Sequence, residues 1–162
     1  MSYAEKEKAI KALLSKAPFD LECNEEHMKL YKVAFTHDSY SNELERGGVK
    51  KDDEPYERLE FLGDAVVGLV ASEYLYHLLQ KPEEGEMSKE KEKIVGNEPI
   101  AKRLEEKRID LFSLCTFSSG LEVSEKNRAG ITSSVFEALI AAVYLNEGYD
   151  KAKGIAQKIL IE

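Results

Sequence analysis

The sequence predicts an all-α protein built as a bundle of several helices. Apolar residues recur three or four positions apart along most of the chain, which places them on one face of a helix. No stretch of useful length alternates apolar and polar residues as a β-strand does. Pro18, Pro55 and Pro82 stand between the periodic segments, where helices are expected to end or begin.

The N-terminal part of the chain predicts two helices and a long loop. The first helix is expected over residues 4–17, because its apolar residues keep helical spacing up to Pro18. The second is expected from Asn24 to Phe35. Residues 42–55 are polar and contain Gly47-Gly48, so they are expected to form a mobile loop.

The longest expected helix covers residues 56–79, between two prolines. Its apolar residues predict that one side is anchored in a core. The residues expected to do this are Leu59, Leu62, Val66, Leu69 and Val70.

The C-terminal part predicts four more helices, the third of them strongly apolar. A short apolar segment over residues 111–114 and a polar loop over residues 116–130 separate the first two from the last two. The four helices are expected over residues 86–95, 97–108, 131–146 and 149–161.

The composition fits a folded protein made of one domain. The chain has 162 residues, of which 43% are hydrophobic and 33% are charged. Its longest apolar run, from Ala138 to Leu145, is far shorter than the roughly 20 residues of a membrane helix, so no membrane is expected. Cys23 and Cys115 are far apart and in no metal-binding spacing, which favours reduced thiols in an intracellular protein, cytoplasmic or nuclear.

Three carboxylates lie on one face of the helix expected over residues 56–79. Glu57, Glu60 and Asp64 are spaced i, i+3 and i+7, and no Lys or Arg one turn away neutralises them. Two carboxylates about 4 Å apart repel by roughly 4 kcal/mol at an effective dielectric of about 20. A divalent cation would compensate for this repulsion, while a solvated helix face is the alternative that the residues alone leave open.

The run from Glu57 to Val66, ERLEFLGDAV, resembles the signature of the ribonuclease III family. These proteins are endonucleases of double-stranded RNA and include Dicer and Drosha. Further elements resemble those of the family in the same order, so that the resemblance covers roughly residues 30–150. The elements are Thr36-His37-Asp38-Ser39, Glu84-Gly85-Glu86-Met87-Ser88, Val95-Gly96-Asn97 and the segment from Val135 to Ile140.

This resemblance implies a fold and an activity. The fold would be that of a single ribonuclease III catalytic domain over residues 1–162, with no double-stranded-RNA-binding domain in this chain. The activity would be hydrolysis of phosphodiester bonds in double-stranded RNA by a homodimer, in RNA processing or silencing. The cofactor would be Mg²⁺, for which Mn²⁺ can substitute.

The resemblance also implies roles for individual residues. Glu60 would be a metal ligand, Asp64 a metal-linked catalytic acid that orients the attacking water, and Glu137 a direct metal ligand with a catalytic role. Glu57 and Glu84 match family acids near the cleavage centre and the dimer contact. Glu57 is therefore placed with the catalytic residues and Glu84 with the RNA-binding residues.

Ser134 departs from the family pattern. The family has an Asp three residues before the final Glu, whereas this chain has Ser134 three residues before Glu137. A hydroxyl is a weaker metal ligand than a carboxylate, so the affinity for Mg²⁺ is expected to fall. Three outcomes stay open, namely an enzyme with a higher metal requirement, a catalytically silent RNA-binding or scaffold dimer, and an engineered substitution.

The net charge of −8 predicts weak, salt-sensitive RNA binding, because phosphate contacts need Lys and Arg. Lys126 and Arg128 precede the second carboxylate helix and are the basic residues expected to contact RNA. The other basic clusters are expected to be solvated.

Two further expectations concern the dimer and His37. Phe61, Val67 and Ala71 are candidates for the dimer contact, with the protein core as the alternative. His37 is expected to have a packing or helix-end role.

Overall fold

The structure, a computed structural model, describes residues 1–48 and 54–162 and confirms the all-α class. Within these residues it contains eight α-helices, one short 3₁₀ turn and no strand. The α-helices are α1 (Tyr3–Leu14), α2 (Glu25–Ala34), α3 (Asp38–Arg46), α4 (Glu57–Leu78), α5 (Glu84–Val95), α6 (Asn97–Glu106), α7 (Glu125–Glu147) and α8 (Tyr149–Leu160), and the 3₁₀ turn η1 is Phe112–Leu114.

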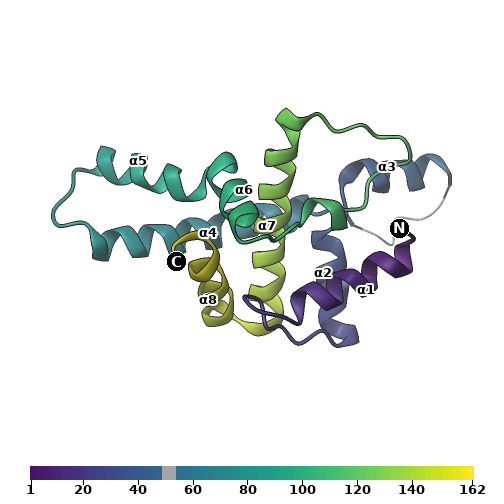
Figure 1. Cartoon of the computed structure of the whole chain (residues 1–162), viewed down its shortest axis with the longest axis horizontal. Helices are drawn as coiled ribbons and strands as arrows, with labels where there is room; N and C mark the ends of the chain where they lie inside the picture. The colour runs from purple at the N-terminus through teal and green to yellow at the C-terminus, as the bar shows by residue number, and fades with distance from the viewer. Residues whose placement is uncertain (49–53) are drawn as a thin grey trace.

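Helix α7 is the centre of the bundle. It runs through the middle of the molecule, and α4 crosses it in the most extensive helix–helix contact of the described residues (Figure 1). Every residue from Val135 to Val143 is buried, which explains why this segment is apolar all round apart from Glu137.

The burial of α7 also bears on the question of a membrane. Among the described residues, α7 is the one helix long and apolar enough to cross a membrane by length and composition alone. However, 61% of its most apolar stretch is buried against the rest of the bundle. Such burial is typical of the core helix of a folded domain.

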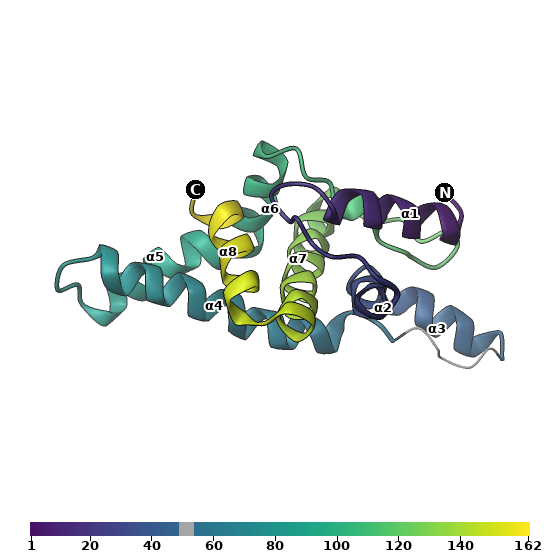
Figure 2. The same cartoon turned by 90° about the horizontal axis from the view of Figure 1, so that it is seen from below.

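Helices α4 and α5 form an antiparallel pair that projects from the bundle (Figures 1 and 2). Ile94 is the one buried residue of α5, so this pair has little core of its own. The pair extends the outer face of α4 well beyond its crossing with α7.

Helix α3 corrects the expectation of a loop over residues 42–55. It begins at Asp38 and includes residues 42–46, while residues 49–53 of the expected loop lie outside the described residues. The ring of His37 caps α3, because its Nδ1 accepts a hydrogen bond from the Ser39 amide at 3.1 Å. The expected helix-end role of His37 is therefore confirmed.

Helix α7 begins earlier than the sequence predicts. Its N-cap is Ser124, whose hydroxyl accepts a hydrogen bond from the Asn127 amide, so residues 125–130 are helix and not loop. Gly130 was a loop signal, but it lies inside the helix facing Asn97. The helix ends at Gly148, whose φ of +90° is a conformation that favours glycine.

A short backbone network holds the start of α4 in place. Thr36 and Thr116 form an isolated parallel bridge, in which the His37 amide donates to the Thr116 carbonyl at 3.0 Å. The Tyr56 amide donates to the Thr36 carbonyl at 2.9 Å, immediately before α4 begins. The start of the carboxylate helix is therefore tied to the segment that follows η1.

The structure corrects the expected position of Leu69 on α4 and selects the core alternative for Val67 and Ala71. Leu69 was expected in the core but is 55% exposed, whereas Val67 and Ala71, named for the dimer contact, are each only 1% exposed. Both residues belong to the hydrophobic core, and α4 packs against α7 and α8. Phe61, by contrast, is 85% exposed. Cys23 and Cys115 are both buried free thiols, as expected.

Candidate active site

The site is built where α4 and α7 cross at very short range. A Cβ atom added to Gly63 would lie 1.7 Å from the carbonyl oxygen of Glu137, so only a glycine allows the two backbones to approach this closely. Glu60 lies one turn before Gly63 on α4, and Asp64 is the residue directly after it. The close crossing therefore brings the acids of two distant sequence segments together.

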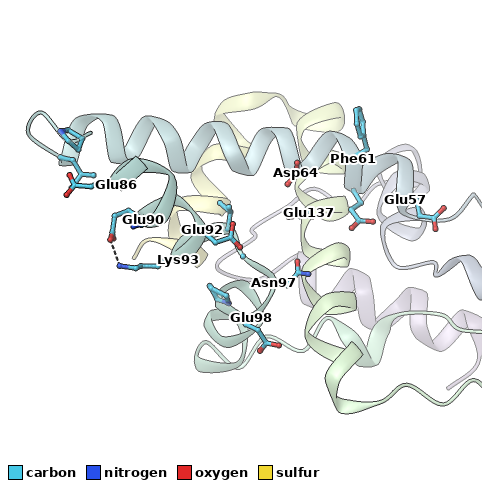
Figure 3. Close-up of a pocket in the computed structure, with 17 residues that line it drawn as sticks. Glu57, Phe61, Asp64, Glu86, Glu90, Glu92, Lys93, Asn97, Glu98 and Glu137 are labelled. Atoms are coloured by element: carbon cyan, nitrogen blue, oxygen red, sulfur yellow. Dashed lines mark hydrogen bonds and ion pairs between the residues drawn. The ribbon is translucent and has the colours of Figure 1, made fainter. Parts of the chain in front are cut away.

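A cleft of about 1510 Å³ opens at this crossing, between α4, α5, α6 and α7. Figure 3 shows Asp64 and Glu137 at the crossing, with Phe61 and Glu57 further along α4. The acids expected on one face of α4 all line this cleft, together with Glu137. These acids are Glu57, Glu60, Asp64 and Glu137.

Ser134 is joined directly to one of these acids. Its hydroxyl donates a hydrogen bond to Oε1 of Glu60, with 2.6 Å between the two oxygen atoms. Such a short distance is typical of an O–H donor on an ionised carboxylate. Ser134 therefore lies at the site, but its hydroxyl is already hydrogen-bonded to Glu60.

Glu137 is the buried acid of the group. Glu137 is only 7% exposed. Burial is the largest cause that raises the pKa of its carboxyl group, to about 8, and the negative charges of Asp64 and Glu60 add to it. Within the described residues, no Lys, Arg or His forms an ion pair with Glu60, Asp64 or Glu137. These three acids therefore lack a basic partner, although Lys89 and Lys93 of α5 line the same cleft.

These residues fit a divalent cation by their chemistry. Carboxylate oxygens that repel one another and lack a basic partner are relieved by a bound cation. Mg²⁺ takes oxygen ligands and keeps several waters, so that two or three carboxylates suffice. Over residues 1–48 and 54–162, no three His, Cys, Asp or Glu side chains already converge as the ligands of one ion do. Binding a cation would therefore require side chains of the site to turn.

The opposite wall of the cleft contains groups to which sequence reasoning gave no role. Glu92 of α5 and Asn97 at the start of α6 face the crossing from this side (Figure 3). Asn97 belongs to the Val95-Gly96-Asn97 element, which was a usable signal. Nothing in the local sequence of Glu92 distinguished it from the other acids of α5.

Glu84 does not join this group. It is the first residue of α5 and is exposed, and the residue of α5's first turn that lines the cleft is Glu86. Within one copy of the chain, Glu84 therefore does not line the cleft with the other acids, and its expected role has no support from this grouping.

The two basic residues expected to contact RNA lie on different sides of α7. Lys126 is exposed and eleven residues before Glu137, a three-turn spacing that places both on one face of the helix. Arg128 instead lines a second groove, where its guanidinium lies 4.3 Å from the centre of the Phe112 ring. Only Lys126 shares the face of the acids.

Comparisons with known proteins agree with this geometry. A family model described as Ribonuclease-III-like matches residues 27–162. Ribonuclease 3 of the Aster yellows witches'-broom phytoplasma is 38% identical over 135 residues, which are 83% of this chain and 54% of the relative. Ribonuclease 3 of Nitratiruptor sp. is 36% identical over 138 residues, 85% of this chain and 56% of the relative. The chain thus spans about half the length of these curated relatives.

Solved structures match over nearly the whole chain. A 2.2 Å crystal structure of the nuclease domain of ribonuclease III from Campylobacter jejuni superposes with a TM-score of 0.68 and 31% identity, covering 99% of this chain and 95% of that chain. A second structure of that domain, described for structural flexibility in the region involved in dimer formation, has a TM-score of 0.68 and 30% identity, covering 98% of this chain and 96% of that chain.

Proposed function

The chain belongs to the ribonuclease III family, and on that premise we propose that it is a divalent-metal-dependent endonuclease that hydrolyses double-stranded RNA as a homodimer. The observation that carries the proposal is the buried carboxylate of Glu137, held beside Asp64 and Glu60 with no basic partner among the described residues. Burying a carboxylate without a basic partner costs free energy, and coordination of a cation would offset that cost.

Each acid of the site has its own proposed role. Glu60 and Glu137 would hold the ion, from α4 and α7 respectively, and Asp64 would orient the attacking water. Glu57 lies further along the same wall of the cleft, where it would face the substrate. When bound, Mg²⁺ or Mn²⁺ lowers the pKa of water and stabilises negative charge on the leaving oxygen.

The proposed substrate is recognised by shape. A-form RNA is contacted mainly at its phosphates and 2′-hydroxyls, so little base specificity is expected. Lys126 is the basic residue we place beside the substrate, and the net charge of −8 keeps the affinity low and sensitive to salt. Because the similar proteins are bacterial, we propose RNA processing in preference to silencing, and we do not retain the nuclear alternative.

The substrate class is tested with matched nucleic acids. We expect the protein with Mn²⁺ to cut an end-labelled RNA duplex at least about 100-fold faster than its separate strands or the DNA duplex of the same sequence, because only the RNA duplex offers A-form geometry with 2′-hydroxyls. Comparable cutting of the DNA duplex would contradict the assignment to double-stranded RNA.

The exposed stripe of α4 supports the homodimer. Phe61, Leu69 and Tyr76 follow one another at spacings of eight and seven residues and so share one face of the helix. They are 85%, 55% and 73% exposed, an apolar surface that a second copy would cover in a symmetric contact. Phe61 also borders the cleft of the acids, which would place the contact beside the active site.

The dimer contact is tested by Phe61→Glu. Because Phe61 is almost fully exposed in one copy, the variant is expected to keep its fold while the dimer dissociation constant rises by at least about 100-fold. Sedimentation equilibrium measures this change. Leu121→Glu, at an apolar residue 43% exposed and outside α4, is the matched control and should leave the dimer intact. An unchanged dimer in Phe61→Glu would remove this face as the interface.

Ser134→Asp tests the reduced charge of the site. The added carboxylate would lie next to Glu60, so the Mg²⁺ concentration for half-maximal cutting is expected to fall on the order of tenfold. The metal-free variant should also be less stable, because the new charge repels its neighbours. Identical Mg²⁺ titrations of the two proteins would place Ser134 outside the metal site.

A further inference from the structure

The hydrogen bond between Ser134 and Glu60 joins two residues 74 positions apart in the chain. An ionised carboxylate only accepts hydrogen bonds, so the Ser134 hydroxyl must be the donor. Its single proton is therefore committed to Oε1 of Glu60. The other oxygen of Glu60 accepts no hydrogen bond among the described residues, which leaves it for a ligand of the site.

The location of this bond limits what Ser134 can do. Glu60 is half-buried at the edge of the cleft, on the same turn of α4 as Gly63, while Ser134 lies one turn before Glu137 on α7. The bond therefore fixes a flexible carboxylate of α4 relative to the buried carboxylate of α7. Groups that orient metal ligands in this way affect metal affinity without touching the ion.

We propose that Ser134 is a positioning residue that acts through Glu60. It fixes the Glu60 carboxylate in one orientation for a divalent cation, and it does so without adding charge. The inference rests on the metal site of the proposed function and goes beyond it, because it assigns to the residue that departs from the family pattern a role other than that of a ligand.

The experiment measures Mn²⁺ binding without RNA, by electron paramagnetic resonance of the free ion. Ser134→Ala is expected to weaken Mn²⁺ binding about tenfold, since Glu60 is no longer held. Ser134→Thr keeps the hydroxyl and should restore the affinity. Thermal unfolding of each variant verifies that the domain is folded.

Ser133→Ala is the matched control. Ser133 is the neighbouring residue on α7, fully buried, and its hydroxyl has no hydrogen-bond partner among the described residues. Removing it deletes a hydroxyl from the same turn of the same helix but no contact with Glu60. Mn²⁺ binding should therefore be unchanged in this variant.

Repeating the Ser134→Ala change in a Glu60→Ala protein distinguishes a positioning role of Ser134 from direct ligation of the ion. In Glu60→Ala, the further change Ser134→Ala should have no effect on the weaker Mn²⁺ binding that remains, because the group on which Ser134 acts is gone. An equal loss in both backgrounds would assign Ser134 to the ion itself and overturn the inference. An unchanged affinity in Ser134→Ala alone, or a parent protein that binds no Mn²⁺, would also overturn it.

The result is distinguishable from a failure of the proposed function. If Mn²⁺ binding follows the expected pattern but the protein cuts no RNA, the inference stands and the nuclease assignment fails. If RNA is cut in a Mn²⁺-dependent manner while Ser134→Ala binds Mn²⁺ as the parent does, the nuclease assignment stands and the inference fails.

Discussion

Glu137→Gln is expected to abolish RNA cleavage, with a loss of at least about 1,000-fold in rate, and to leave the domain folded. The change replaces a buried carboxylate oxygen of the site by an amide of the same shape, so that a bound cation would lose the ligand that we propose for α7. The measurement is single-turnover cleavage of an RNA duplex at saturating Mn²⁺.

Although it loses activity, the same variant is expected to be more stable than the parent protein when no metal is bound. The pKa of Glu137 is raised to about 8 in the folded protein, above its value near 4.5 in the unfolded chain. The metal-free folded state therefore holds a proton that the unfolded state has released, and stability falls as the pH rises from about 4.5 to 8. Glu137→Gln lacks this loss, so it should exceed the parent in unfolding free energy by on the order of 2 kcal/mol at pH 8 and above.

Urea unfolding in a chelator across this pH range measures the difference between the two proteins. It should be largest at pH 8 and shrink toward pH 4.5. Glu125→Gln is the matched control, because Glu125 is an exposed acid at the start of the same helix. Cleavage by Glu137→Gln at the parental rate would remove Glu137 from the active site.

Gly63→Ala is expected to destabilise the domain by about 2–4 kcal/mol and to disrupt the site. The added Cβ would meet the Glu137 carbonyl oxygen at 1.7 Å and its carbonyl carbon at 2.4 Å, which are backbone atoms that cannot rotate away. Helices α4 and α7 must then separate, with loss of packing along their whole crossing. Metal binding should weaken as well, since Glu60 and Asp64 would move away from Glu137.

Gly68→Ala provides the control on the same helix. A Cβ at Gly68 would meet only the flexible end of the Lys91 side chain, at 3.3 Å. This variant should be neutral or more stable by up to about 1 kcal/mol, because alanine favours the helix. Equal unfolding free energies for Gly63→Ala and Gly68→Ala would contradict the close crossing of α4 and α7.

The sequence was most informative where a helix is long and periodic. The helix expected over residues 56–79 is observed as Glu57–Leu78, because its apolar pattern and flanking prolines act together. Helix α3 and the first turns of α7 were missed, since both consist of polar residues and depend on caps at His37 and Ser124. Such caps satisfy backbone amides and leave little trace in an apolar pattern.

The candidate site was likewise predicted from the sequence only in part. The grouping of Glu57, Glu60 and Asp64 was predicted from spacing on one helix, which is a local property. The separation of Lys126 from Arg128 could not be predicted without the start of α7, because it depends on which face of that helix each residue occupies. The bond from Ser134 to Glu60 depends on how two distant helices cross, and no local pattern encodes that crossing.

The most direct test of the central claim is cleavage of an end-labelled, perfectly paired RNA duplex at low salt across a titration of Mg²⁺ and of Mn²⁺. We expect cutting that requires either ion, that needs less Mn²⁺ than Mg²⁺, and that is absent at every concentration in Glu137→Gln. No cutting by the parent at any metal concentration, with the protein folded and dimeric, would contradict the nuclease assignment and favour a catalytically silent dimer that binds RNA or serves as a scaffold.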